Sequence, residues 1–227
     1  MDRAAVERIW LVRHAESTHP HVFNGAETDV ELSDTGYRQA EALAMWLRKR
    51  QPTAVVSSGM KRAIDTAVPV ARTCQVPHTL EPDLHERRIG ILAGTELTFD
   101  AGPWPETVRQ WTAGDTSYTT PGAESFDDIA ERCLAAWNRV VAAHPGGRVA
   151  VIAHGVVCKV LLLRLLNGYR PADWPRIGSV TNVSVSELVP DGDGWRAERL
   201  LEVPETVLSL TVQLPPNTPP PRLRSEG

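Results

Sequence analysis

The chain of 227 residues is long enough for one large domain and needs no second hydrophobic core. Its hydrophobic fraction of 42% and charged fraction of 23% are those of an ordinary soluble globular protein. The net charge of -4 argues against a general attraction to nucleic acid or to an anionic membrane, so any site for an anion must be local.

Strand-like and helical patterns alternate along the chain. Apolar runs typical of strands occupy residues 8–13, 54–58, 148–153, 181–188 and 195–201. Helical patterns occupy residues 33–50, 61–73, 123–144 and 156–168. This order predicts an α/β fold in which helices cover both faces of a largely parallel sheet.

The remaining segments carry weaker patterns. Residues 95–122 are rich in Gly, Pro, Thr and Trp, and we expect an excursion that covers a site. The proline-rich tail at 203–227 is not expected to form a regular element. We therefore expect a single catalytic domain over residues 1–202. The apolar strand at 181–188 is a candidate for pairing across a homodimer.

Polar side chains gather where apolar runs end. They are Arg13 and His14, Ser57 and Ser58 followed by Arg62, then His85, Glu86 and Arg87, and finally His154. Because ligands bind beyond the carboxyl ends of the strands in an open parallel sheet, we expect these side chains to meet at one edge.

Two arginines and two histidines at one edge would form a pocket for a dianion such as a phosphoryl group. In such a pocket a neutral imidazole is a competent nucleophile. Glu86 is the one carboxyl there that could pass a proton to a departing alcohol. This chemistry requires no metal.

Five sequence blocks resemble the histidine phosphatase superfamily, also called phosphoglycerate mutase-like. The blocks are LVRHAES (11–17), SSGMKRAIDTA (57–67), LHERRIGILAG (84–94), PGAES (121–125) and VIAHG (151–155), in the family's order. The resemblance covers about residues 7–188. It implies a three-layer sandwich with a mostly parallel, six-stranded sheet, and it implies a phosphatase that works through phosphohistidine.

The resemblance also implies a role for each matched residue. His14 would be the nucleophile that forms phosphohistidine, while Arg13, Arg62 and His154 would hold the phosphoryl oxygens. Glu86 would donate a proton to the leaving group in the first half-reaction and activate water in the second. The substrate would be a small phosphorylated metabolite.

Two segments depart from the family pattern. Asn24 and Gly25 sit where the family has a small polar residue and a glycine that touch substrate, but their loop lacks the usual tryptophan-asparagine pair. Where the mutase pattern has a lysine and two adjacent arginines, the excursion at 95–122 has only Arg109. We therefore favour hydrolysis over a cofactor-dependent phosphoglycerate mutase. A non-catalytic phospho-ligand binding protein is a third alternative.

Several of these residues also have structural interpretations. His14 could be a hydrogen-bonded core histidine, and His154 could cap the helix that follows it. Glu86 could pair with Arg87 or Arg88 in a solvated charge run. Within five ordered blocks we favour the catalytic interpretations.

Residues outside the main site leave further alternatives. His19 and His21 form an H-x-H pattern that could suggest a metal, but no carboxylate or cysteine is suitably spaced, so a flexible loop is favoured. Trp104 and Trp111 either line a lid or anchor the excursion to the core. Glu124 is expected to serve the N-terminus of the long helix that follows it.

Cysteine usage and the N-terminus bear on the compartment. Cys74, Cys133 and Cys158 are scattered without a C-x-x-C pair, which excludes a disulfide framework and a zinc ribbon. The first ten residues lack the apolar stretch of a signal peptide. We therefore expect a cytoplasmic protein whose partner is a small phosphomonoester, with no nucleic acid, membrane or cofactor.

Overall fold

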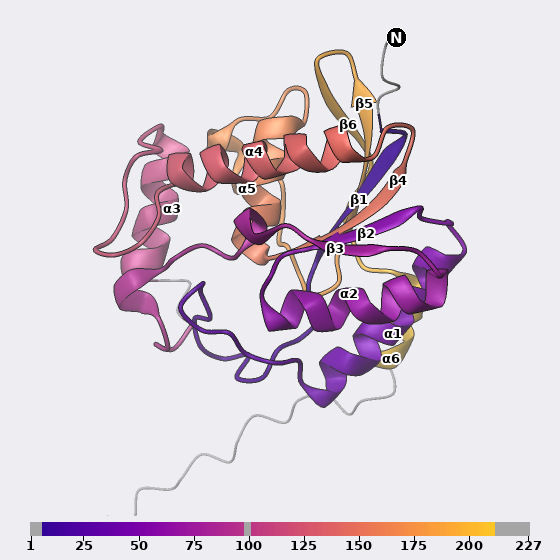
Figure 1. Cartoon of the computed structure of the whole chain (residues 1–227). Helices are drawn as coiled ribbons and strands as arrows, with labels where there is room; N and C mark the ends of the chain where they lie inside the picture. The colour runs from indigo at the N-terminus through magenta and orange to yellow at the C-terminus, as the bar shows by residue number, and fades with distance from the viewer. Residues whose placement is uncertain (1–5, 98–100, 212–227) are drawn as a thin grey trace, which may run out of the picture.

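A six-stranded sheet lies between two layers of helices in the computed structural model, which describes residues 6–97 and 101–211 (Figure 1). The strands are β1 (Arg8–Arg13), β2 (Ala54–Ser57), β3 (His78–Leu80), β4 (Arg148–Ala153), β5 (Val185–Asp191) and β6 (Gly194–Glu202). The helices are α1 (Asp34–Arg48), α2 (Lys61–Cys74), α3 (Pro103–Ala113), α4 (Phe126–Ala143), α5 (Gly155–Leu165) and α6 (Glu205–Thr211).

The strand order is β3-β2-β4-β1-β5-β6. The first four strands of this order are parallel to one another. Strand β5 is antiparallel to β1, and β6 at the edge is antiparallel to β5. The predicted three-layer α/β fold with a mostly parallel, six-stranded sheet is confirmed. The parallel part of the sheet contains β1, β2 and β4, which lead into the sequence blocks at 11–17, 57–67 and 151–155, so it positions the site.

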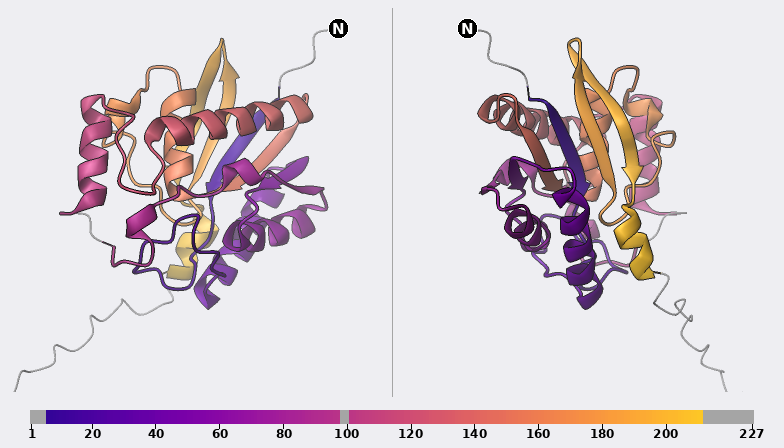
Figure 2. Two further views of the ribbon diagram at one scale, coloured as in Figure 1. Left: turned by 60° about the vertical axis from the view of Figure 1, so that its left-hand side comes forward. Right: turned by 90° about the vertical axis from the view of Figure 1, so that its right-hand side faces the viewer.

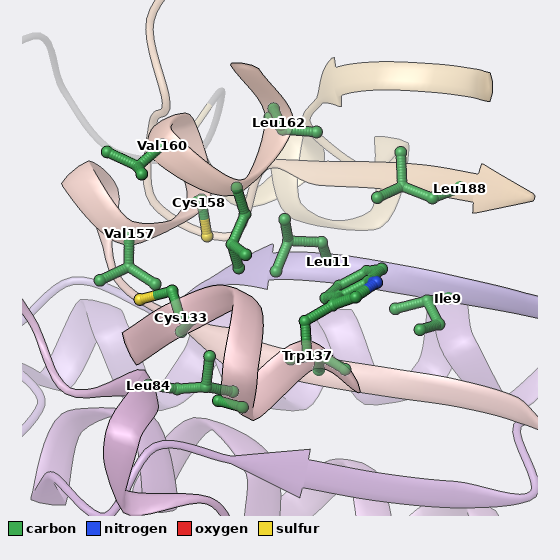
Figure 3. Close-up of a cluster of buried hydrophobic side chains, with 14 of the residues drawn as sticks. Ile9, Leu11, Leu84, Cys133, Trp137, Val157, Cys158, Val160, Leu162 and Leu188 are labelled. Atoms are coloured by element: carbon green, nitrogen blue, oxygen red, sulfur yellow. The ribbon is translucent and has the colours of Figure 1, made fainter. Parts of the chain in front are cut away.

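Alternating side chains of β1 fill two separate cores. Ile9 and Leu11 belong to the cluster that includes buried residues of α4 and α5, whereas Trp10 and Val12 belong to the cluster with α1 and α2. This follows from the two-residue period of a strand, whose successive side chains point to opposite faces. Figure 2 shows the helical layers on the two sides of the sheet, and Figure 3 shows the first cluster around Trp137.

Local sequence signals explain where the long helices begin. The Ser33 hydroxyl accepts a hydrogen bond from the Gly36 N–H at the start of α1, and Ser125 forms a reciprocal capping box with Asp128 at the start of α4. The most apolar helix, α5, is buried on nearly all sides, with its polar positions at Lys159 and Arg164. Among the described helices, none combines the length and apolar character that crossing a bilayer requires.

The excursion contains a helix that we did not predict. Helix α3 begins at Pro103, and a second proline follows within its first turn, where a missing N–H costs no intrahelical bond. Trp104, Val108 and Trp111 recur at helical spacing, but the glycines and prolines around them obscured this signal. Residues 98–100 of the excursion lie outside the described part of the chain.

Two expectations about the C-terminal part are wrong. The strand predicted at 181–188 begins at Val185, and it is hydrogen-bonded on both sides, to β1 and to β6, so it has no free edge for pairing across a dimer. The homodimer itself stays a prediction. Residues after 203 do form a regular element, because α6 packs on α1 through buried Val207 and a hydrogen bond from the Thr206 hydroxyl to the Ala42 carbonyl. Residues 212–227 of the predicted tail lie outside the described residues.

Candidate active site

The register of the sheet brings two histidines together. Strands β1 and β4 are neighbours, with Arg13 paired to Ala153, so His14 and His154 leave the sheet side by side. The chain then continues from β1 into α1 on one face and from β4 into α5 on the other. A crevice opens at such a switch point beyond the carboxyl ends of the strands. The two imidazole centroids lie 5.1 Å apart.

A cavity of about 590 Å³ lies at this edge of the sheet. Five of the predicted site residues line it, namely Arg13, His14, Asn24, Arg62 and Glu86. His154 is fully buried against His14 rather than part of the lining, and Gly25 is not part of the lining either. The structure thus places the predicted cations, the nucleophile candidate and the carboxyl around one space.

His14 is oriented by its own backbone. Its Nδ1 lies 2.6 Å from the Ala15 carbonyl oxygen, and because a carbonyl only accepts, Nδ1 carries the proton. The neutral ring therefore keeps its lone pair on Nε2. Burial lowers the pKa of His14 well below its usual value, and the charges of Arg62 and Arg13 lower it further. The ring is neutral at physiological pH, as a nucleophile must be.

His154 is held by Ser58, the residue directly after β2. Its Nε2 lies 2.9 Å from the Ser58 hydroxyl, while its Nδ1 is buried without a hydrogen-bond partner among the described residues. Burial, followed by the charge of Arg62, lowers its pKa well below the usual value. His154 stands at the N-cap of α5, but its side chain makes no capping hydrogen bond, so the capping interpretation is wrong.

The two arginines are held by carbonyl oxygens rather than by carboxylates. Arg13 donates to the Val180 carbonyl at 2.7 Å, and Arg62 donates to the carbonyls of Thr28 at 2.8 Å and Gly25 at 3.2 Å. Neither forms an ion pair within the described residues. Burial lowers the pKa of both guanidinium groups, and the charge of Glu86 partly offsets this effect. Guanidinium groups that line a cavity and form no ion pair with a described carboxylate favour a bound anion.

Glu86 faces the same cavity with 8% of its surface exposed. Its Oε1 accepts from its neighbour's backbone, the Arg87 N–H, at 2.9 Å, and its Oε2 accepts from the Val156 N–H of α5 at 3.4 Å. Its side chain forms no ion pair with Arg87 or Arg88, so the solvated charge run is the wrong interpretation. Glu86 instead lines the cavity that His14 also lines.

A buried ion pair holds the segment that carries Glu86. Arg132 of α4 pairs with Glu124 at 2.7 Å and donates to the carbonyls of Asp83 and His85 at 2.7 and 2.9 Å. Glu124 also accepts from the Arg88 N–H at 2.8 Å. The expectation that Glu124 serves the N-terminus of α4 is therefore wrong, because the capping box performs that task and Glu124 ties α4 to the Glu86 segment.

Asn24 and Gly25 have mainly structural contacts. The Asn24 amide donates to the His19 carbonyl at 3.0 Å, which closes its own loop, although Asn24 also lines the cavity. A Cβ on Gly25 would lie 2.5 Å from the Ile89 side chain and 2.9 Å from the Arg87 carbonyl. Gly25 is thus required for the close approach of two loops, and its carbonyl holds Arg62.

The structure also bears on the alternatives for the two tryptophans of the excursion and for the H-x-H pattern. Trp111 is fully buried and anchors α3 to the core, whereas Trp104 lines the cavity. His19 and His21 are exposed, with ring centroids 6.4 Å apart. Within residues 6–97 and 101–211, no group of three or more His, Cys, Asp or Glu side chains could hold a metal ion.

The sequence reasoning missed two residues at the site. Asn182 donates from its side chain to the His14 carbonyl at 3.1 Å, and it carried no sequence signal because it lies in a loop far along the chain. Lys159 lines the cavity from α5. Its helical spacing of four from Gly155 is a signal that could have identified it.

Known protein families, curated proteins and solved structures resemble this chain. The family model of the histidine phosphatase superfamily (branch 1) matches residues 9–202. A metal-independent phosphoserine phosphatase from Arabidopsis thaliana is 38% identical over 168 residues, which are 70% of this chain and 69% of that protein. A glucosyl-3-phosphoglycerate phosphatase from Mycolicibacterium vanbaalenii is 33% identical over 201 residues, covering 83% of this chain and 88% of that protein.

A solved structure of mycobacterial glucosyl-3-phosphoglycerate phosphatase superposes with a TM-score of 0.72 at 28% identity, over 86% of this chain and 98% of that one. The chain spans about half the length of three further mycobacterial relatives, 52% of each at 32% identity. The predicted family and the predicted enzyme class, a phosphatase, are confirmed by these matches. The chain belongs to the histidine phosphatase superfamily, branch 1.

Proposed function

We propose that the chain hydrolyses small phosphomonoesters through a phosphohistidine formed on His14, without a metal ion. The observation that carries this proposal is a neutral His14 whose Nε2 has no hydrogen-bond partner among the described residues, beside Arg13 and Arg62, which have no carboxylate partner there. Two relatives, the metal-independent phosphoserine phosphatase and the glucosyl-3-phosphoglycerate phosphatase, support a small phosphorylated substrate.

The first half-reaction transfers the phosphoryl group to the enzyme. His14 Nε2 attacks phosphorus, the P–N bond forms, and the P–O bond to the alcohol breaks. Glu86, which faces the cavity, gives its proton to the departing alkoxide, so the product leaves as an alcohol and Glu86 becomes a carboxylate.

The second half-reaction returns the enzyme to its starting state. The Glu86 carboxylate takes a proton from a water molecule as that water attacks phosphorus. The P–N bond breaks, its electron pair returns to His14 Nε2, and inorganic phosphate leaves. Glu86 is protonated again and is ready for the next substrate.

The cations supply the electrostatic stabilisation that the transfer needs. Arg13 and Arg62 each have N–H groups left over after their carbonyl hydrogen bonds, and both line the cavity. If the Ser58 hydroxyl donates to Nε2 of neutral His154, Nδ1 carries a proton with no partner in the described protein. The arginine donors line the cavity and are already in place in the folded protein, so little reorganisation accompanies the build-up of charge on the phosphoryl oxygens.

Hydrolysis of p-nitrophenyl phosphate in the presence of EDTA tests the proposal. We expect activity in the native chain and its loss by a factor of about 1,000 or more in His14→Ala, the scale on which removing a nucleophile acts. His144→Ala, at the C-terminus of α4, is the matched control and should keep its activity. Full activity of His14→Ala would contradict the proposal.

The two alternative functions give different products. A phosphoglycerate mutase would convert 3-phosphoglycerate into 2-phosphoglycerate, whereas a phosphatase would release free phosphate from it. A phospho-ligand binding protein would bind inorganic phosphate but would not hydrolyse 3-phosphoglycerate to free phosphate. Measuring both products in one incubation separates all three functions.

A further inference from the structure

One lysine lies in the wall of the active-site cavity without an assigned role. Lys159 of α5 is half-buried, and its Nζ donates to the Gly178 carbonyl at 2.8 Å. The same Nζ lies 4.6 Å from the centroid of the Trp174 ring, which also lines the cavity. An ammonium group has three N–H donors, so these contacts leave donors for a ligand.

Lys159 lies within reach of a substrate held at the phosphoryl site. Gly155 and Lys159 share one face of α5, a single turn apart, and a Cβ on Gly155 would lie 3.6 Å from Arg13 Nε. The loop at 178–180 gives a second link, because Arg13 donates to Val180 while Lys159 donates to Gly178. Two residues of extended chain therefore separate the two cations, which places them at most about 13 Å apart.

The charge of Lys159 has no counter-charge in the described protein. It forms no ion pair, and burial alone lowers its pKa to about 8, so it remains largely a cation at neutral pH. The cation of the excursion, Arg109, is instead exposed and paired with Glu106 at 2.6 Å. Ser179 and Thr181, which carry hydroxyl groups, line the cavity one and three residues after Gly178, whose carbonyl Lys159 contacts.

We propose that Lys159, with Ser179 and Thr181 beside it, forms a second anion site that binds a carboxylate on the alcohol part of the substrate. A single ammonium suits a monoanion such as a carboxylate, whereas the dianionic phosphoryl group is met by two arginines at the other end. The inference rests on the proposed phosphatase activity and deepens it, because it names the chemical class of the substrate as a phosphorylated carboxylic acid.

Matched substrates that differ in one group test this site. 3-Phosphoglycerate has a carboxylate where glycerol 3-phosphate has a hydroxymethyl group. O-Phosphoserine has a carboxylate that O-phosphoethanolamine lacks. We expect the native chain to prefer the carboxylate-bearing member of each pair in kcat/KM by about tenfold or more, the contribution of a charge-assisted hydrogen bond.

The variant Lys159→Met keeps the length of the side chain and removes its charge. We expect the preference within each pair to fall to near one and to be regained in part by Lys159→Arg. The loss should appear in KM, because the carboxylate contact is the same before and during phosphoryl transfer. A residue with only a structural role would lower kcat for both substrates and leave their ratio unchanged. Since each ratio is taken on one preparation, partial unfolding of a variant cancels.

Lys49→Met, on the exposed end of α1, is the matched control and should keep the native preference. An unchanged preference in Lys159→Met, or a native chain that hydrolyses both members of each pair equally well, would overturn the inference and leave the phosphatase proposal intact. A native chain that hydrolyses none of these substrates and no p-nitrophenyl phosphate would overturn the proposed function, and this inference with it.

Discussion

The imidazole rings of His14 and His154 lie 5.1 Å apart, centroid to centroid, and are tilted by 59°. This closeness follows from the parallel pairing of β1 with β4, and Ser58 at the end of β2 contacts the second ring from the opposite side. Three neighbouring strands therefore determine the position of the nucleophile and of its partner, which gives the site the rigidity of the sheet.

Removal of the Ser58 hydroxyl should weaken catalysis without removing a group that touches substrate. In Ser58→Ala, the Nε2 of His154 loses its hydrogen bond, and the buried ring is free to change tautomer or rotate. We expect kcat to fall about tenfold, the effect of one such bond on a barrier. Ser209→Ala on α6 serves as the control. Equal kcat in the native chain and Ser58→Ala would show that Ser58 does not orient His154.

The buried histidines should make the protein less stable in mild acid. The pKa values of His14 and His154 are lowered by burial, whereas in the unfolded chain they are close to 6.5. Below pH 6.5 the unfolded state therefore binds more protons than the folded state. As the pH is lowered, the free energy of unfolding decreases by about 1.4 kcal/mol per pH unit for each histidine.

Urea unfolding between pH 7.5 and pH 5.0 measures this dependence. In His154→Gln one of the two histidines is removed, so the free energy of unfolding should decline less steeply below pH 6.5 than in the native chain. Identical slopes would mean that His154 takes up its proton in the folded state as readily as in the unfolded one.

Gly25 and Gly59 provide a matched pair of glycine substitutions. The new Cβ of Gly25→Ala would lie 2.9 Å from the Arg87 backbone carbonyl, so one of the two loops must move. We expect a loss of about 1–3 kcal/mol of stability, together with lower activity, because the same loop holds Arg62. Gly59→Ala meets no atom closer than 4.0 Å and should change neither property. Chemical denaturation and phosphatase assays on both variants check this, and equal stabilities would refute it.

Arg132 and Arg139 both lie on α4, but the side chain of Arg132 is 14% exposed and that of Arg139 is 50% exposed. In Arg132→Met, the Glu124 carboxylate loses a buried partner and the carbonyls of the Glu86 segment lose a donor. We expect destabilisation by about 3 kcal/mol and a lower kcat. Arg139 is half-exposed in its pairs with Glu81 and Asp83, so Arg139→Met should cost less than about 1 kcal/mol. Similar losses in both variants would contradict the role given to the buried pair.

Much of the site could be predicted because its parts are local in sequence. Arg13 and His14, and likewise His154, follow directly after apolar strands, and parallel strands present such ends at one edge. The pairing of β1 with β4 is a long-range property of the sheet, so the distance between the two histidines could not be predicted from local patterns.

The parts that could not be predicted depend on tertiary contacts. Strand β3 has only three residues at an edge of the sheet and carries no alternating pattern. The sequence position of Glu124 is typical of an acid at a helix N-terminus, and its hydrogen bond with Arg132, eight residues later, depends on the tertiary structure. The role of Lys159 could not be predicted, because its position opposite the Gly178 carbonyl depends on how a loop distant in sequence folds.

The most direct measurement is the identity of the phosphorylated atom. Rapid quenching during turnover of a labelled phosphomonoester, followed by peptide mapping and nitrogen–phosphorus NMR, locates the phosphate on the trapped enzyme. The account predicts one phosphate on Nε2 of His14, because Nδ1 of that ring is bound to the Ala15 carbonyl. Phosphate on Nδ1, phosphate on His154, or turnover with no phosphorylated histidine would contradict it.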